Sequence, residues 1–460
     1  MNTTETPMPT LDATQLRDRL EILARGAGIE RWDLGAACST DTSVQVDRGE
    51  AKQMKGAQRS SITVRVWNGD GLVGVTSTSD LSDSGLERAL TGARDASSFG
   101  NPEDTPAFSP LATAPLEPLE QPCHAPCSIL DLLDTLRDAE RQLLERHPAI
   151  GTVPYNGLAQ RSSERLYLNS AGACRQQQLS TASLYLYARA EESGRKPRSA
   201  GAVRLAYGAD ELDISGCIEE AAELTIAHLD YAPIETGYYT CVFSPEAFLD
   251  LIGAFSNLFN ARSVLDGISL STRESLGKAI AVPFLDLHDD PRHPGNIGAS
   301  AFDGEGTPTA RLALLEGGVL RHFLHSEATA RTFGAQPTGH AGMGAKVSVG
   351  PSWFSVAATP GSSGGAQGLN RFTASEPIVW IDSLSALHAG VKASQGSFSL
   401  PFDGWLLRGG ERRSIEAATV AGDIRKVLQA IVGFEGEAKI TPDGLCPHVW
   451  VEGLSITGEA

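Results

Sequence analysis

The sequence has 460 residues, 41% hydrophobic and 20% charged, which is typical of a folded protein with a sizeable core. Its net charge of -18 argues against a nucleic-acid or anionic-membrane partner, because phosphates attract basic surfaces. No stretch approaches the roughly 18 apolar residues of a membrane span. Seven scattered cysteines indicate reduced thiols and a cytoplasmic protein. Residues 1–12 lack the basic and apolar regions of a secretory signal, and we predict a disordered tail there.

The first half of the chain predicts an N-terminal α/β domain over residues 13–232. Its first unit, residues 13–100, opens with the amphipathic helix "TQLRDRLEILARGAG" and continues into strands with alternating apolar residues, "SSITVRVWNGDGLVGVTST". The helix "LERALTGARDAS" closes it. Residues 101–127 are rich in proline and indicate a connector.

The second unit, residues 128–232, repeats this order. Ser128 is the expected N-cap of the helix "ILDLLDTLRDAERQLLERH", the strand "TASLYLYARA" follows, and "DISGCIEEAAELTIAHL" closes the unit. A helix–sheet–helix pattern that occurs twice predicts an α+β fold with an internal pseudo-repeat.

Residues 233–460 predict a second domain of a different kind. Short apolar strands, such as "YYTCVFS", "EPIVWIDSL" and "HVWVEGLSI", alternate with glycine-rich turns, which favours a curved antiparallel β-sheet or a barrel-like domain. Two helices are expected in it. One is "TVAGDIRKVLQAIVG", with an apolar face that includes Ile424 and Ile431, and the other begins after Ser244.

The helix after Ser244 has strong local signals. Ser244 suits the N-cap, and Pro245 suits the first helical position, where its missing N–H is not needed. Gly253 and Ala254 are small enough for a neighbouring backbone to pack closely. One continuous apolar face is predicted from Phe248, Leu251, Ile252, Phe255, Leu258 and Phe259.

Familiar catalytic signatures are missing from the sequence. It has no phosphate-binding loop, no GxSxG elbow and no His-Glu dipeptide, which excludes every HExxH zinc helix. Candidate groups remain in three loops. "HDDPRHPG" holds Asp289 and Asp290, "FDGEG" holds Asp303 and Glu305 with turn-capping as the favoured role, and "TGHAG" holds His340. The cluster "CHAPC", Cys123 to Cys127, fits no standard zinc spacing.

Several of these segments together resemble the TldD/PmbA (TldE) family, the modulators of DNA gyrase. The resemblance is carried by "ESLGKAIAVPFLDLHDDP", "SAFDGEGTPTARLALLEGGVLRHFLHSEATARTFGAQPTGHAG", "GSFSLPFDGWLLRGGE" and "VWVEGLSITG". It is most specific over residues 236–458. It implies an N-terminal domain of repeated α/β units and a C-terminal domain of strongly curved antiparallel sheet.

The resemblance also implies a function. The TldD branch is a cytosolic zinc metallopeptidase with a HExxxH helix and a late cysteine ligand, whereas the PmbA/TldE branch lacks those ligands and pairs with TldD. In this chain Leu251, Ile252 and Phe255 stand where the metal-binding helix is expected, and there is no histidine between His228 and His288. Cys446 is the only cysteine after Cys241. The chain therefore resembles the zinc-less branch.

Three hypotheses follow. The leading one is a non-catalytic TldE/PmbA-like subunit of a cytoplasmic heterodimer, with no metal of its own, zinc on the TldD-like partner, and unfolded or extended peptides as substrates. Its candidate substrate-chamber residues are Asp303, Glu305, Thr338, Gly339 and His340. The alternatives are a stand-alone hydrolase built from Asp289, Asp290, Asp303, Glu305 and His340, and a peptide-binding homodimeric scaffold.

Overall fold

The computed structural model describes residues 11–102, 105–344, 346–361 and 376–458. The chain forms two compact units. The first, unit 1, comprises Met1–Ile226, Ser300–Thr309 and His325–Ser348, and the remainder of the chain forms unit 2. Two segments of the predicted C-terminal domain therefore belong to unit 1. None of the helices in the described ranges is long and apolar enough to cross a membrane.

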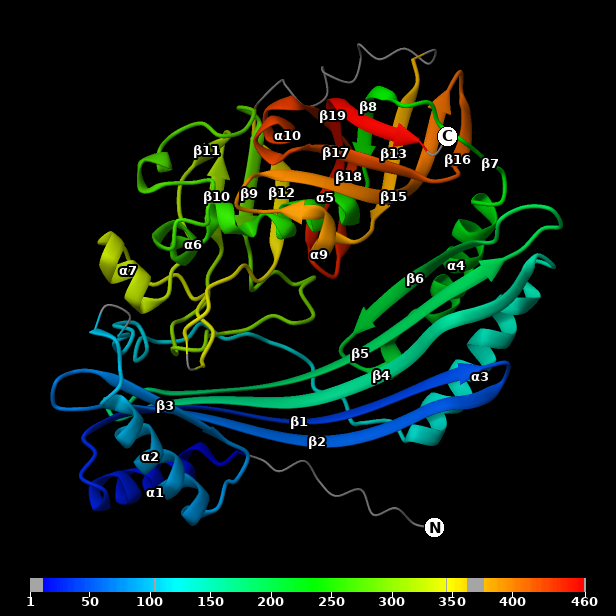
Figure 1. Cartoon of the computed structure of the whole chain (residues 1–460). Helices are drawn as coiled ribbons and strands as arrows, with labels where there is room; N and C mark the ends of the chain where they lie inside the picture. The colour runs from blue at the N-terminus through cyan, green and yellow to red at the C-terminus, as the bar shows by residue number, and fades with distance from the viewer. Residues whose placement is uncertain (1–10, 103–104, 345, 362–375, 459–460) are drawn as a thin grey trace. The chain divides into compact units, whose positions relative to one another are not determined.

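Unit 1 contains the predicted pseudo-repeat (Figure 1). Each copy is a helix, a three-stranded antiparallel meander and a second helix, and the fold-class prediction is confirmed. The first copy comprises α1 (Ala13–Gly26), β1 (Arg31–Asp47), β2 (Glu50–Trp67), β3 (Val73–Thr78) and α2 (Asp83–Ser97). The second comprises α3 (Ile129–Glu145), β4 (Ile150–Asn169), β5 (Cys174–Ala190), β6 (Arg198–Ala206) and α4 (Ile214–Ala227).

The two meanders join into one six-stranded sheet with the order β3-β2-β1-β4-β5-β6. The first strands of the two copies, β1 and β4, pair antiparallel at its centre. Ser128 is the N-cap of α3, as predicted, and its hydroxyl accepts from the N–H of Asp131. Of the predicted tail, residues 1–10 lie outside the described residues, whereas Leu11 is buried and Asp12 caps α1.

One face of this sheet packs against helices α1 and α2. Leu20 of α1 and Leu90 of α2 meet Leu34, Val64 and Leu168 of the strands in one apolar core. Because side chains alternate between the two faces of a strand, the neighbours of these core residues point to the opposite face. That second face contains the polar site described below.

The proline-rich connector packs against the sheet of unit 1. Trp67 donates its indole N–H to the carbonyl oxygen of Pro106 at 2.8 Å, and Arg175 donates to the carbonyl oxygens of Leu111 and Ala114. Ala112 belongs to a small apolar cluster with Tyr167 and Phe302. The connector therefore covers part of the second sheet face, since its backbone is fixed there by side chains from the strands.

Unit 2 is built around a closed barrel of five strands, in the order β8-β13-β15-β17-β19 and back to β8. All of these pairings are antiparallel except β8 with β13. The barrel strands are β8 (Gly237–Phe243), β13 (Ile378–Leu384), β15 (Ser397–Arg408), β17 (Ala418–Asp423) and β19 (Gly444–Gly458). The predicted barrel-like C-terminal domain is confirmed.

Further strands extend this barrel. The ribbon β12-β9-β10-β11 continues from β19, and β18 also pairs with β19, while β14 and β16 pair with β15. These strands are β9 (Leu285–Asp289), β10 (Leu312–Glu316), β11 (Val319–Leu320), β12 (Phe354–Ala358), β14 (Val391–Lys392), β16 (Glu411–Ile415) and β18 (Ile431–Thr441), with β7 (Tyr231–Ala232) beside β16.

Helix α5 (Pro245–Ala254) follows β8 and packs against β19 and β13. Its capping is as predicted, because the Ser244 hydroxyl accepts from the N–H of Ala247 and Pro245 occupies the first turn. The helix ends earlier than its apolar pattern predicts, and a 3-10 turn at Ser256–Phe259 continues it. All six predicted face residues are nevertheless buried.

Three shorter α-helices also lie in the described part of unit 2. One of them, α10 (Ile424–Ala430), corrects a prediction. The segment "TVAGDIRKVLQAIVG" was expected to be one helix, but its ends belong to β17 and β18. Asp423 caps the short helix by accepting from the N–H of Arg425. The remaining two are α6 (Ala261–Leu265) and α9 (Leu387–Gly390).

Candidate functional site

A buried ion pair lies on the second face of the unit 1 sheet. The strand register places Asp33 of β1 directly opposite Arg65 of β2. The Arg65 Nε lies 2.9 Å from Asp33 Oδ1, and its Nη2 lies 2.5 Å from Oδ2. Tyr167 of β4 donates its hydroxyl to the same Oδ2 at 3.1 Å. The pair is bidentate and supported by a further hydrogen bond, the geometry that a buried charge pair needs.

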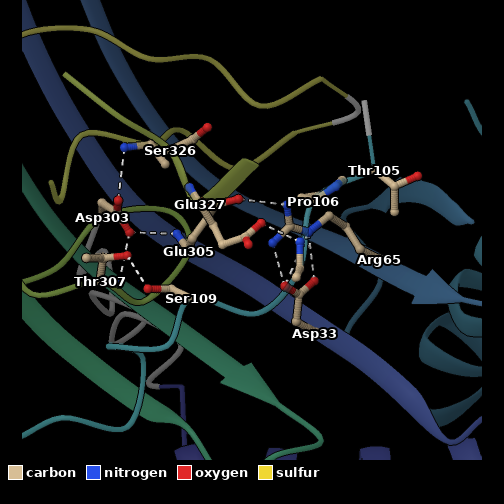
Figure 2. A network of polar contacts seen from close by, with 12 residues as sticks. Asp33, Arg65, Thr105, Pro106, Ser109, Asp303, Glu305, Thr307, Ser326 and Glu327 are labelled. Carbon is tan, nitrogen blue, oxygen red and sulfur yellow. Dashed lines mark hydrogen bonds and ion pairs between the residues drawn. The ribbon is translucent and has the colours of Figure 1, made fainter. Parts of the chain in front are cut away.

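Glu305 connects this pair to another part of the chain. Its Oε1 lies 3.4 Å from Arg65 Nη1, and its Oε2 accepts from the backbone N–H of Glu327 at 2.8 Å. Glu327 is the first residue of α7 (Glu327–Phe333), whose remaining N-terminal capping comes from Ser326. Figure 2 shows these groups together. Glu305 therefore links the sheet, its own loop and the start of a helix.

The protonation of Glu305 differs from that of an exposed glutamate. Burial raises the pKa of Glu305 to about 7; Arg65 opposes this shift and Asp303 adds to it. Burial alone lowers the pKa of Arg65, but the neighbouring Asp33 and Glu305 raise it, and the net shift is upward. A carboxyl group with a pKa near 7 can exchange a proton at neutral pH. Glu305 is 0% exposed, so the gain or loss of this proton changes the stability of the loop.

The side chain of Glu327 extends the same network to the connector. Its Oε2 accepts from the backbone N–H of Ala107 at 2.7 Å, and its Oε1 accepts from Arg331 at 3.1 Å. Close by, Thr307 donates its hydroxyl to Ser109 at 2.8 Å (Figure 2). The network therefore joins the sheet, the connector and both segments that the second half of the chain contributes to unit 1.

Asp303 organises the loop that presents Glu305. Its Oδ1 accepts from the N–H groups of Glu305 and Thr307 at 2.8 and 2.9 Å, and its Oδ2 accepts from the N–H of Ala341 at 2.9 Å. Burial raises the pKa of Asp303, while these three N–H groups lower it. The carboxylate thus has the turn-capping role that its glycine-rich context favours.

Two glycines allow close approach in this loop region. Gly306 has a φ of +76°, and a Cβ there would lie 2.5 Å from the Tyr167 ring. Gly339 has a φ of +80°, and a Cβ there would lie 2.6 Å from the Pro308 carbonyl oxygen. Both positions need glycine, for the left-handed backbone and for the missing side chain.

Thr338 joins the two buried histidines of this region. Its Oγ1 accepts from the backbone N–H of His325 at 2.7 Å and lies 2.9 Å from His340 Nδ1. The predicted substrate-chamber residues therefore gather within unit 1. Glu305 and Asp303 are held by the polar network, and Thr338, Gly339 and His340 form a neighbouring turn.

A cavity of about 240 Å³, which we call the sheet-face cavity, lies beside this network. Asp303 is on its wall, together with Arg165 of β4. Burial lowers the pKa of Arg165, and its guanidinium donates to Ser300 at 2.9 Å. The remaining wall is formed by Gly35, Ala36, Ala37, Ser61, Thr63, Leu166, Tyr167, Phe302, Gly304, Ala341, Gly342 and Met343.

A second cavity lies in unit 2 along α5, and we call it the α5 cavity. Leu249, Asp250, Gly253 and Ala254 line it, whereas Leu251, Ile252 and Phe255 point into the protein core. Gly253 is small enough for close packing, but no neighbour uses this space, because a Cβ there would meet nothing within 4 Å. Gly253 borders open space, since the packed face of the helix lies on its other side.

The remaining predicted ligands have structural partners. Asp289 in β9 accepts from the N–H of Ser352 at 2.7 Å, and Cys446 is buried with its Sγ 3.2 Å from the Pro447 carbonyl oxygen. His124, between Cys123 and Cys127, lies 3.1 Å from Glu211. Within the part of the chain that the structure describes, no group of three or more His, Cys, Asp and Glu side chains could hold a metal ion.

Sequence reasoning did not select Asp33, Arg65 and Tyr167. Arg65 stands between Val64 and Val66, and such alternation ordinarily places the polar residue in solvent. No local pattern in the sequence marked these three residues. Only the fold shows that loops from the second half of the chain cover the polar face of the sheet.

The comparisons with known proteins cover most of the chain. Residues 236–458 match the PmbA/TldA metallopeptidase C-terminal domain, residues 126–229 the central domain, and residues 39–97 domain 1 of the same family. Metalloprotease PmbA of Escherichia coli O157:H7 is 21% identical over 432 residues, which is 93% of this chain and 92% of that protein.

Solved structures show the same fold. A protein of Thermotoga maritima described as a modulator of DNA gyrase superposes with a TM-score of 0.84 at 24% identity, over 96% of this chain and 100% of that one. TldE from Thermococcus kodakarensis gives 0.81 at 19% identity, with the same coverage. The three domain matches follow one another along most of the chain, and the chain therefore belongs to the PmbA/TldD family of metallopeptidases.

Proposed function

We propose that this chain is the non-catalytic, TldE-like subunit of a cytoplasmic TldD/TldE complex that cleaves unfolded or small peptides. In this proposal the zinc ion and the catalytic groups belong to a TldD-like partner. The chain contributes to the substrate chamber and positions the peptide. Several of the relatives are named metalloproteases.

The observation that supports the proposal most strongly is the composition of α5. This helix follows the first barrel strand, and its buried face is formed by Phe248, Leu251 and Ile252. Burying such side chains stabilises the fold by roughly 1.5–3 kcal/mol each, so packing alone accounts for that face. Its other face offers Leu249, Asp250 and Ala254, and a single carboxylate is too few ligands for a zinc site.

The late cysteine is also poorly suited to bind a metal. Cys446 is 0% exposed, and among the described residues it belongs to no group of three or more His, Cys, Asp and Glu side chains that could hold a metal ion. A buried neutral thiol near the Pro447 carbonyl is instead an ordinary core residue.

The sheet of unit 1 has an exposed apolar patch. Tyr155, Tyr187, Val203 and Leu205 occupy one face of β4, β5 and β6 and are between 38% and 72% exposed. α4 packs on the opposite face, where Thr225 donates to the Ala200 carbonyl oxygen. Exposed aromatic and aliphatic side chains in one patch are typical of association surfaces. We propose that this sheet patch contacts the TldD-like chain.

Peptide hydrolysis tests the proposal. The purified chain, a TldD-like chain and their mixture are incubated with an unfolded peptide, with and without a chelator. We expect cleavage only with the TldD-like chain present, loss of cleavage with chelator, and one zinc per heterodimer with none on this chain. Chelator-sensitive cleavage by this chain alone would contradict the proposal.

A further inference from the structure

The sheet-face cavity has a floor of small residues. The strand register places Ala37 of β1 directly between Arg165 of β4 and Ser61 of β2, and Gly35 on the same strand has no side chain. Small residues on the middle strand leave a hollow of about 240 Å³ between larger neighbours. This volume is below the range of drug-sized ligand pockets, so the cavity suits one small group. All of its lining residues belong to unit 1.

Arg165 places a positive charge on the wall of this cavity. Its Nη1 donates to the Ser300 hydroxyl at 2.9 Å, and its guanidinium lies 5.3 Å from the centre of the Phe302 ring. Its Nε and Nη2 have no partner among the described residues, and neither atom is fully enclosed by the protein. One complete edge of the guanidinium is therefore unpaired and accessible at the cavity.

Two other arginines on this face show how such an edge is used. In Arg65, Nε and Nη2 hold the two carboxylate oxygens of Asp33. In Arg175, the same two atoms donate to backbone carbonyl oxygens, with Nε 3.2 Å from that of Gly306. Arginines away from solvent are normally paired, so the empty edge of Arg165 indicates a partner from outside the chain.

The geometry of the edge favours a carboxylate. The N–H groups on Nε and Nη2 point in parallel, and their spacing matches the two oxygens of a carboxylate, as the Arg65–Asp33 pair shows. Because a guanidinium stays protonated in proteins, the charge is present at every pH of interest.

The other groups of the wall limit the choice further. Asp303 uses its carboxylate oxygens to accept from three backbone N–H groups and forms no ion pair with Arg165, but its charge is close. This charge disfavours a dianion such as phosphate and leaves room for one negative charge. Phe302 and Met343 also line the cavity, and they suit an apolar group attached to the carboxylate.

We propose that the sheet-face cavity binds a carboxylate group of a peptide through Nε and Nη2 of Arg165. The apolar part next to that carboxylate contacts Phe302 and Met343. Both a C-terminal carboxylate and an acidic side chain present this chemistry. The inference rests on the proposed function only for the peptide as the source, because binding is a property of this chain alone.

The test measures the affinity of two pairs of probes for the purified full chain by calorimetry. N-acetyl-leucine and N-acetyl-leucinamide compare a C-terminal carboxylate with its amide. Nα-acetyl-glutamate N-methylamide and its glutamine counterpart do the same for a side chain. In at least one pair the acid should bind about tenfold more tightly than the amide, the effect of one bidentate charged contact. The pair that shows the preference identifies the source.

Equal affinity of acid and amide in both pairs, or no binding of any probe, would overturn the proposal. Inorganic phosphate that binds more tightly than the preferred acid would contradict a site for a single negative charge. These comparisons use the wild-type chain and do not depend on the folding of a variant.

Variants locate the binding to the cavity. R165Q should reduce the affinity for the acid about tenfold and leave the amide unchanged, whereas A37L should weaken both by filling the floor. R161Q is the matched control. Arg161 lies on the same strand and the same sheet face but is 53% exposed and outside the lining, so R161Q should change affinity less than about twofold. Equal losses in R165Q and R161Q would place the site elsewhere.

The contact itself is visible by nuclear magnetic resonance. The Nε–H resonance of Arg165, assigned with R165Q, should shift when the preferred acid binds and stay in place with its amide. An unchanged resonance would contradict the proposed contact. Cleavage assays with the partner chain test the proposed function separately, so either idea can fail alone.

Discussion

Asp33 and Arg65 are direct cross-strand neighbours, and their side chains form a bidentate ion pair that is almost completely buried. Tyr167 and Glu305 complete its surroundings. The position of the pair is a consequence of strand register, since a shift of one strand by one residue would send its member of the pair to the opposite face. The segments that cover the sheet therefore depend on this register.

Removing Arg65 should destabilise unit 1 strongly. R65L leaves the carboxylates of Asp33 and Glu305 buried without a cation, which costs about 3–5 kcal/mol in similar cases. Urea denaturation measures the loss. R59L is the control, because Arg59 is 58% exposed and lies 3.7 Å from Asp41, so it should lose at most about 1 kcal/mol. Equal losses in both variants would contradict a structural role for the buried pair.

The stability of the protein should depend on pH through Glu305. Its pKa is about 7 in the folded protein and its ordinary value is 4.5, so between these values the folded state holds more protons than the unfolded state. This contribution is fully present below about pH 4.5 and is lost as the pH rises through 7. Asp303 acts in the same direction.

E305Q isolates this contribution, because a glutamine does not titrate. Thermal unfolding at pH 5, 6, 7 and 8 should show wild type losing stability relative to E305Q as the pH rises. If wild type and E305Q differed in melting temperature by the same amount at every pH, Glu305 would make no pH-dependent contribution to stability.

Gly339 should not tolerate a side chain. G339A forces an unfavourable left-handed backbone, which costs roughly 1–2 kcal/mol, and adds a clash with the Pro308 carbonyl oxygen. Gly334 is the matched control, because its φ is +66° but a Cβ there would meet nothing within 4 Å. G339A should therefore lower the melting temperature more than G334A. Similar shifts in both would show that close approach at Gly339 is unimportant.

The sheet patch should be needed for assembly with the partner. The double variant Y187D/V203D places two charges in it, and co-purification with a TldD-like chain should fall at least about tenfold. I22D is the control, since Ile22 is exposed on α1 in unit 1 and lies outside the patch. Undiminished pairing of the double variant would place the interface elsewhere.

Local signals in the sequence predicted local structure well. The N-caps Ser128 and Ser244 and the repeated helix–meander–helix order depend on neighbouring residues, and the structure has them. The α10 prediction failed because its apolar pattern continues into β18, and periodicity alone does not separate a short helix from a buried strand.

The site depended on contacts distant in sequence. Arg65 and Glu305 are 240 residues apart, and no local pattern indicates that they meet. Gly253 looked suited to close packing because the sequence does not show which helix face is covered. In both cases the missing information was the tertiary neighbour.

The division of the chain between the units has a practical consequence for fragments. A protein truncated after residue 232 would keep both copies of the pseudo-repeat but would lose Ser300–Thr309 and His325–Ser348. Its Arg65–Asp33 pair and the apolar ring of Tyr167 would then be exposed to water, without Glu305 and Phe302. The boundary between the central and C-terminal family domains is therefore a poor site for truncation. A soluble N-terminal fragment would need Ser300–Thr309 and His325–Ser348 grafted onto its sheet.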